Sequence, residues 1–203
     1  MNLVHVEAAL LVVDKPAGLL SVPGRGEAGQ DNLTTHLQAL HPDTLAVHRL
    51  DLATSGLMVF ARGPEVQRRL NRAFEMRQVE KRYEAIVEGE IAADAGEIDA
   101  PLAADWPNRP RQQVDTERGK PALTRWQVLA RSPGQTRLAL FPVTGRSHQL
   151  RVHLQHIGHP IRGDEFYAPL PLTAPRLLLH ATQLRFDHPL TGEALCFDSP
   201  APF

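Results

Sequence analysis

The sequence predicts an α+β fold with a mixed, mostly antiparallel central sheet and flanking helices and loops. Short apolar runs typical of strands recur along most of the chain. Helical periodicity occurs at only a few places between them. A regular alternation of strand and helix, which a doubly wound parallel sheet requires, is missing. These observations together favour α+β over a parallel α/β architecture.

The first elements are predicted by an apolar run and by helix-capping residues. Residues 10–13 form an uninterrupted apolar run and predict a strand. The glycine-rich stretch 16–30 predicts an ordered loop. Residues 32–40 predict a helix, with Asp31 or Asn32 as its N-cap, because short polar side chains satisfy the first backbone N–H groups.

Two strands and a second helix are expected next. The apolar runs 45–47 and 57–61 predict short buried strands, with Ser55-Gly56 as the turn between them. Gly63-Pro64 predicts a helix start, because proline is favoured at the first helical position. The core face of this helix is expected to contain Val66, Leu70, Ala73 and Phe74.

The second half of the chain predicts mostly strands. They are expected at residues 83–87, 123–129, 136–141, 177–179, 184–186 and 194–197. Residues 101–121 are polar and rich in proline, which indicates a surface excursion between strands. Residues 147–158 predict a third helix, ended by Gly158 and Pro160.

Composition and charge restrict the class of protein. The 203 residues are 42% hydrophobic and 22% charged, as in ordinary soluble globular proteins. No apolar run approaches the roughly 20 residues that a membrane span needs, and no secretory signal is visible, so we expect a cytoplasmic protein without a membrane partner. A metal site is not expected, because the chain has no His-Glu-x-x-His motif and a single cysteine.

The net charge of −1 argues only weakly against nucleic acid, because the basic residues are clustered. Residues 62–82 contain seven basic and three acidic side chains, and residues 137–163 contain four arginines and no carboxylate. A basic face on a neutral protein fits a limited contact such as an RNA stem-loop. For either cluster alone, a solvated helix face is the more common explanation.

A charged loop between the strands expected at 45–47 and 57–61 is the strongest chemical signal. It begins with His48-Arg49-Leu50-Asp51. A carboxylate at Asp51 suits a nucleophile or a base, and the guanidinium of Arg49 suits a phosphate contact or the face of a base. Taken alone, these two residues are more simply a turn-capping carboxylate and a surface charge.

Longer strings of residues resemble the RluA-type pseudouridine synthases. The matching segments are 13–19 (Lys-Pro-x-Gly), 48–56 (His-Arg-Leu-Asp to Thr-Ser-Gly), 80–85 (Lys-x-Tyr), 145–154 (Gly-Arg-Ser-His-Gln-Leu-Arg) and 158–164. They occur in the family's order, with Ser147 in place of the more usual threonine. The resemblance implies the pseudouridine synthase fold and an RNA-modifying isomerase that uses no cofactor and no metal. Such an enzyme breaks the N1–C1′ bond of uridine and joins C5 to C1′.

The resemblance also implies roles for individual residues. Asp51 becomes the catalytic carboxylate, acting at C1′ or C6, and Arg151 becomes its ion-pair partner, with phosphate binding as the alternative for Arg151. Tyr83 is expected to stack on the target base and to relay a proton. Enzymes of this class flip the base out of its stack, and Arg49 has the reach to fill the gap. RNA contacts are expected from Arg49, His48, Arg146, Arg68, Arg72, Arg109 and Arg111.

The segment 105–111, continuing to 116–121, resembles the short members of the family. This implies a 23S rRNA hairpin and a tRNA anticodon stem-loop as substrates. We expect a monomer in which residues 1–203 form one catalytic domain without a separate N-terminal RNA-binding domain. Two alternatives stay open, a catalytically silent RNA-binding or RNA-folding module on the same scaffold and a metal-dependent hydrolase.

Overall fold

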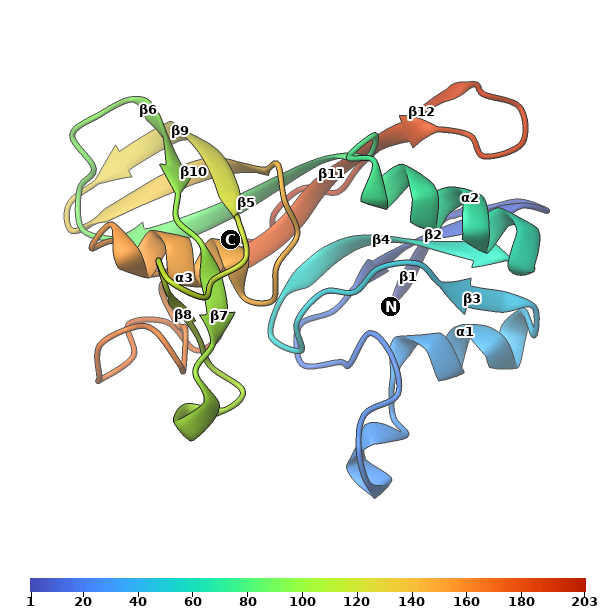
Figure 1. Ribbon diagram of the computed structural model, residues 1–203, viewed down its shortest axis with the longest axis horizontal. Helices are drawn as coiled ribbons and strands as arrows, with labels where there is room; N and C mark the ends of the chain where they lie inside the picture. The colour runs from blue at the N-terminus through green and yellow to red at the C-terminus, as the bar shows by residue number, and fades with distance from the viewer. The chain divides into compact units, whose positions relative to one another are not determined.

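The computed structural model describes residues 1–203, apart from the side chain of residue 28. The chain divides into two compact units, drawn in Figure 1. Unit 1 contains Met1–Lys81 and His180–Pro202, and unit 2 contains Arg82–Leu179 and Phe203. Each unit combines helix with mostly antiparallel strands, which confirms the predicted α+β class. Among the described residues, no helix is both long and apolar enough to cross a bilayer.

Unit 1 is built on a mixed sheet. Its strands are β1 (Asn2–Val6), β2 (Leu10–Lys15), β3 (Thr44–Ala46), β4 (Ser55–Arg62), β11 (Leu179–Asp187) and β12 (Ala194–Asp198). They are ordered β1-β2-β4-β11, with β3 also pairing β4 and β12 pairing β11. The described pairs within this unit are antiparallel, except that β4 runs parallel to β11.

Two helices complete unit 1, α1 (Leu33–Leu40) and α2 (Pro64–Glu75). The side chain of Asn32 caps α1 by accepting the Thr35 N–H at 3.0 Å, as predicted. Helix α1 lies against β3, and α2 lies against β3 and β4 (Figure 1). The predicted core face of α2 is confirmed, because Val66 and Leu70 are buried against β2 and β4.

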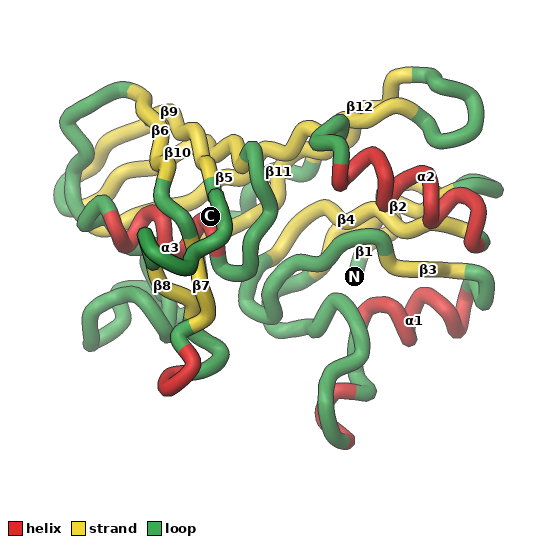
Figure 2. The backbone as a smooth tube through the Cα atoms, viewed as in Figure 1, coloured by secondary structure: helices red, strands yellow, loops and turns green.

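Unit 2 contains the antiparallel order β5-β10-β9-β6 (Figure 2). Its strands are β5 (Glu80–Glu88), β6 (Ala95–Asp99), β7 (Leu102–Ala104), β8 (Gln112–Val114), β9 (Leu123–Ser132) and β10 (Gln135–Pro142). Strands β7 and β8 form a separate hairpin, with a short 3₁₀ turn, Trp106–Asn108, at its tip. Helix α3 (Gln149–His156) packs on this hairpin through the buried side chains of Val152 and Leu102.

Several predicted boundaries were wrong for tertiary reasons. Ser55 and Gly56 belong to β4 rather than to a turn, because both pair with β11, a strand more than 100 residues away. The strand predicted at 184–186 lies within β11 (Leu179–Asp187), whereas the strand predicted at 177–179 is wrong except for Leu179, the first residue of β11. The third helix begins at Gln149 rather than at residue 147, because His148 adopts a left-handed backbone with φ 52°.

Four further strands had no clear signal in the sequence. Strands β1 and β6 are mostly exposed, so the apolar alternation that marks a half-buried strand is absent from them. The surface excursion expected over residues 101–121 proves to contain the ordered hairpin of β7 and β8.

Candidate active site

The loop that carries Asp51 connects β3 to β4 in unit 1. A tight turn closes it, since the Thr54 N–H donates to the Asp51 carbonyl at 3.1 Å. The buried hydroxyl of Ser21 accepts from the Leu50 N–H at 3.0 Å and donates to the Leu50 carbonyl at 2.7 Å. Asp51 is half-buried and Arg49 is exposed. The backbone is therefore held on both sides of Asp51.

Lys15 holds the same loop through a hydrogen bond to its backbone. Although Lys15 is fully buried, its ammonium donates to the carbonyls of Pro16, Leu19 and Leu52 at 2.9, 2.8 and 3.2 Å. Burial lowers the pKa of Lys15 to about 8, and the negative charge of Asp51 opposes this shift. The Gly18 N–H also donates to the Leu52 carbonyl, at 2.9 Å. Residues of the Lys-Pro-x-Gly segment thus fix the backbone directly after Asp51.

His48 is half-buried and packs against other residues of unit 1. Its Nε2 accepts the Val59 N–H at 3.0 Å, and its ring stacks on Phe74 with the centroids 4.6 Å apart. Burial and, to a smaller extent, the positive charge of Lys81 together lower the pKa of His48 to about 3. The imidazole is therefore neutral near pH 7. This geometry favours a structural role, and the RNA contact predicted for His48 stays a prediction.

A chain of hydrogen bonds fixes the beginning of β4. The Ser199 hydroxyl donates to the Asp14 carboxylate at 2.6 Å, so Ser199 must accept the N–H at Nε2 of His180, 3.1 Å away. Nδ1 of His180 is then an acceptor, and the Ser55 hydroxyl donates to it at 2.8 Å. His180 and Ser55 are buried. These contacts attach the residues that follow the Asp51 turn to β11 and to the C-terminal segment.

Arg151 lies on α3 in unit 2 and is almost completely buried. Its Nε and Nη2 donate to the two carboxylate oxygens of Asp164, each at 2.7 Å. The backbone N–H groups of Phe166 and Tyr167 also donate to Asp164, at 3.0 and 3.3 Å. The Arg151 guanidinium carbon lies 5.3 and 5.2 Å from the centroids of these two rings. A bidentate buried pair of this kind holds the guanidinium in one orientation.

Asp164 received no role in the sequence analysis, although it ends one of the motif segments. The available signal was the pair Gly163-Asp164 itself. Gly163 has φ +74°, and a Cβ there would lie 1.9 Å from the Arg176 carbonyl oxygen. Only glycine fits at this position, which brings Asp164 up to Arg151. The predicted ion pair of Arg151 with Asp51 joins residues of different units and stays a prediction.

Tyr83 and Arg146 lie at different places in unit 2. Tyr83 is half-buried on β5, opposite Leu140 of β10. Arg146 is exposed in the segment before α3, where its Nε donates to the Pro121 carbonyl at 3.1 Å. Arg146 therefore keeps a surface position that an RNA phosphate can reach.

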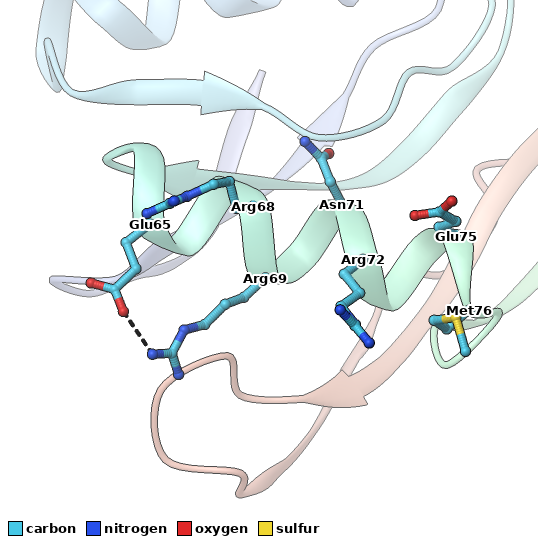
Figure 3. A pocket seen from close by; sticks show the side chains of 7 residues that line it. All are labelled: Glu65, Arg68, Arg69, Asn71, Arg72, Glu75 and Met76. Atoms are coloured by element: carbon cyan, nitrogen blue, oxygen red, sulfur yellow. Dashed lines mark hydrogen bonds and ion pairs between the residues drawn. The ribbon is translucent and has the colours of Figure 1, made fainter.

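The arginines predicted on the second helix lie on the exposed face of α2. This face forms an open pocket lined by Glu65, Arg68, Arg69, Asn71, Arg72, Glu75 and Met76 (Figure 3). Arg69 is engaged, since it donates to Glu65 at 2.6 Å and to the Pro189 carbonyl at 2.9 Å. Arg68 and Arg72 are exposed and form no described ion pair, so they present positive charge to solvent.

The two arginines predicted on the segment 105–111 lie around the tip of the β7–β8 hairpin. Arg109 is exposed, and its guanidinium carbon lies 4.8 Å from the ring centroid of Trp106. Arg111 is half-buried, with its guanidinium carbon 5.5 Å from the ring of Tyr167. The Tyr167 hydroxyl accepts the Gln112 N–H at 2.8 Å, which fastens the hairpin to the residues around Arg151.

Two histidines of unit 2, His148 and His153, contact protein groups. Nδ1 of His148 lies 2.7 Å from the Tyr167 hydroxyl. His153 is buried, with Nδ1 2.9 Å from the Thr124 hydroxyl and Nε2 2.9 Å from the Ala100 carbonyl. Within the part of the chain that the structure describes, no group of three or more His, Cys, Asp or Glu side chains is arranged to hold a metal ion.

Comparisons with known proteins point to one family. The family model described as RNA pseudouridylate synthase matches residues 9–156. A protein of Pasteurella multocida is 48% identical, with 100% of this chain and 94% of that protein covered. One of Escherichia coli K12 is 49% identical, with 96% and 90% covered, and both are named dual-specificity RNA pseudouridine synthase RluA.

A solved structure agrees with these sequence matches. Human RNA pseudouridylate synthase domain containing 1 has a TM-score of 0.83 and 28% identity, and the match covers 100% of this chain and 84% of the human one.

Proposed function

Since this chain belongs to the RNA pseudouridylate synthase family, we propose that it isomerises specific uridines in RNA stem-loops with Asp51 as the catalytic carboxylate. The reaction breaks the N1–C1′ bond, turns the base, forms the C5–C1′ bond and releases the C5 proton, while N1 takes up a proton. The carboxylate acts as nucleophile at C1′ or C6, or stabilises charge at C1′. The observation that carries this role is the Asp51 loop, which Ser21 and Lys15 hold through buried hydrogen bonds.

Arg151 is the proposed partner of the Asp51 carboxylate. Its guanidinium is already oriented by Asp164 and by two aromatic rings, so little side-chain entropy would be lost when it acts. Tyr83 is proposed to stack on the target base and to receive or relay the C5 proton. We also propose that residues 1–203 act as a single catalytic domain.

The substrate must present its uridine outside the stack. Arg49 is exposed and adjoins the buried backbone of Leu50, so its guanidinium is the proposed group that fills the gap left by the flipped base. Phosphate contacts are assigned to the exposed Arg68, Arg72, Arg109 and Arg146 and to the half-buried Arg111.

The relatives named dual-specificity synthases support two RNA substrates for this chain. Because residues 105–121 resemble the short members of the family, we propose that these are a 23S rRNA hairpin and a tRNA anticodon stem-loop. We also propose that the protein acts as a monomer in the cytoplasm, because neither RNA substrate requires a second subunit or another compartment.

Tritium release from C5-labelled uridine tests the assignment of Asp51. Wild type is expected to release tritium from at least one of the two RNAs without added metal. Asp51→Asn is expected to abolish release while its RNA affinity stays within about tenfold, because the change removes charge from the chemistry and not from the phosphate contacts.

Asp187→Asn is the matched control, since Asp187 is an exposed aspartate of the same unit, and it should behave as wild type. Residual turnover in Asp51→Asn with strongly weakened binding would contradict the assignment. Binding without release by wild type, on total cellular RNA as well, would instead indicate a silent RNA-binding module.

A further inference from the structure

The tip of the β7–β8 hairpin exposes a tryptophan. Trp106 is 68% exposed, whereas Trp126, on β9, is only 8% exposed. Tryptophan is on average a highly buried residue, so an indole presented to water in this way has an unused apolar surface. The guanidinium of Arg109 lies over the Trp106 ring at 4.8 Å from its centroid. The indole therefore already carries a cation over one part of its π-system.

The tip is held in shape by its own hydrogen bonds. The Asp105 N–H donates to the Arg111 carbonyl and the Arg111 N–H to the Asn108 carbonyl, each at 3.0 Å. The Asn108 side-chain amide donates to the two carboxylate oxygens of Asp105 at 3.1 and 3.0 Å, so this carboxylate forms its hydrogen bonds within the turn. A ring on such a preformed turn loses little conformational freedom when a ligand binds.

The chemistry of the tip identifies the kind of ligand. An exposed aromatic ring with an arginine over it is a combination on which unpaired nucleobases stack, while nearby arginines contact the adjoining phosphates. A duplex offers its bases only in pairs and would leave the indole uncovered. A single ring with a cation over it is also too small for the contiguous apolar patch that a protein partner needs.

We propose that Trp106 and Arg109 form a stacking site for one unpaired nucleobase of the RNA substrate, with Arg111 contacting its phosphate. The inference rests on the proposed function only in taking the ligand to be the RNA substrate. It assigns to the hairpin the recognition of loop nucleotides, whereas the arginines of α2 suit the backbone of a stem.

Tryptophan fluorescence of the full chain reports directly on this site. In Trp126→Phe, Trp106 is the remaining tryptophan of the sequence. Its emission should be quenched by an anticodon stem-loop RNA, and a fully paired duplex of the same stem should leave it almost unchanged, because stacking on a base quenches indole emission.

Affinity provides the second measurement, in the wild-type background. Trp106→Ala should weaken binding of the stem-loop about tenfold, and Trp106→Phe should retain most of the affinity, since a phenyl ring still stacks. Leu170→Ala is the control, because Leu170 is an 81% exposed apolar side chain elsewhere in unit 2 and should have no effect.

Wild-type affinity in Trp106→Ala, or equal quenching by stem-loop and duplex, would overturn the stacking site. These outcomes are separable from failure of the proposed function. Tritium release by wild type, together with unchanged RNA binding by Trp106→Ala, would refute only the stacking site. Quenching in Trp126→Phe and weakened binding in Trp106→Ala, in a protein whose wild type releases no tritium, would refute only the proposed activity.

Discussion

The charged side chain of Lys15 is completely buried, and its ammonium donates three hydrogen bonds. Removing an ammonium from water is costly unless hydrogen bonds replace those to solvent, and three carbonyls do so here. One of them belongs to Leu52, directly after Asp51. The residue therefore links the stability of unit 1 to the position of Asp51, the proposed catalytic carboxylate.

Lys15→Met is expected to lower both stability and turnover. Methionine has a similar length but no donor, so the carbonyls of Pro16 and Leu19 lose their partner, at a cost of about 1–3 kcal/mol in the free energy of unfolding. Because the Leu52 carbonyl is released too, kcat should fall more than KM rises. Urea unfolding and tritium release measure the two effects. Lys120→Met, at an exposed lysine, is the control, and wild-type values in Lys15→Met would refute this role.

His48 makes the stability of the protein depend on pH. Its pKa is about 3 in the folded chain, against an ordinary value of 6.5. Between these values the unfolded chain binds a proton that the folded chain does not, so the free energy of unfolding falls as the pH decreases. Above about pH 6.5 both states leave His48 neutral, and this contribution to the pH dependence vanishes.

The prediction is tested by comparing wild type with His48→Phe. Phenylalanine keeps the stacking on Phe74 but cannot titrate, so the fall in stability between about pH 6.5 and pH 4 should be shallower in the variant. Urea unfolding at several pH values gives the slopes. Parallel curves for the two proteins would show that His48 titrates normally in the folded state.

At the level of elements, β4 shows why the motif ends in Ser-Gly. The strand starts where it meets β11, and Gly56 has φ +114° at this point. A Cβ on Gly56 would lie 2.4 Å from the backbone N and O of Ala181. The glycine is therefore required by a close backbone approach and not by a turn.

Gly56→Ala is expected to destabilise the protein by several kcal/mol, because both the backbone conformation and the close contact oppose a side chain. Gly192→Ala is the matched control. It also has a positive φ, +77°, but a Cβ at this position would meet no atom within 4 Å, so the substitution should cost about 1 kcal/mol. Thermal unfolding compares the two, and equal losses would contradict the close-approach explanation.

The whole molecule combines a net charge of −1 with exposed arginines on α2 and on the β7–β8 hairpin. RNA affinity should therefore fall with salt, but with the modest slope of a few phosphate contacts. Arg68→Ala and Arg72→Ala should each reduce the magnitude of the slope of log K against log salt by roughly 0.7–0.9.

Affinity measured at several salt concentrations tests this assignment of the α2 arginines. Arg125→Ala is the control, because Arg125 is an exposed arginine of β9 that pairs with Glu97 at 3.5 Å. The control should keep the wild-type slope. An unchanged slope in both α2 variants would place the phosphate contacts elsewhere.

The sequence by itself determined the fold class, most helices and strands, the family and the residues nominated for chemistry. Local signals were sufficient for these, such as the cap at Asn32, the proline at the start of α2 and the motif around Asp51. Each of them depends on neighbours within a few residues of the chain, which is the range that periodicity and capping describe.

Only the tertiary structure decided how these residues are supported. The role of Lys15, the inward packing of His48 and the pairing of Arg151 with Asp164 all depend on groups brought together by folding. So does the inclusion of Ser55 and Gly56 in β4, which needs a partner strand from the far end of the chain. Such contacts leave no periodic trace in the sequence, because burial and hydrogen bonding across long separations are set by packing.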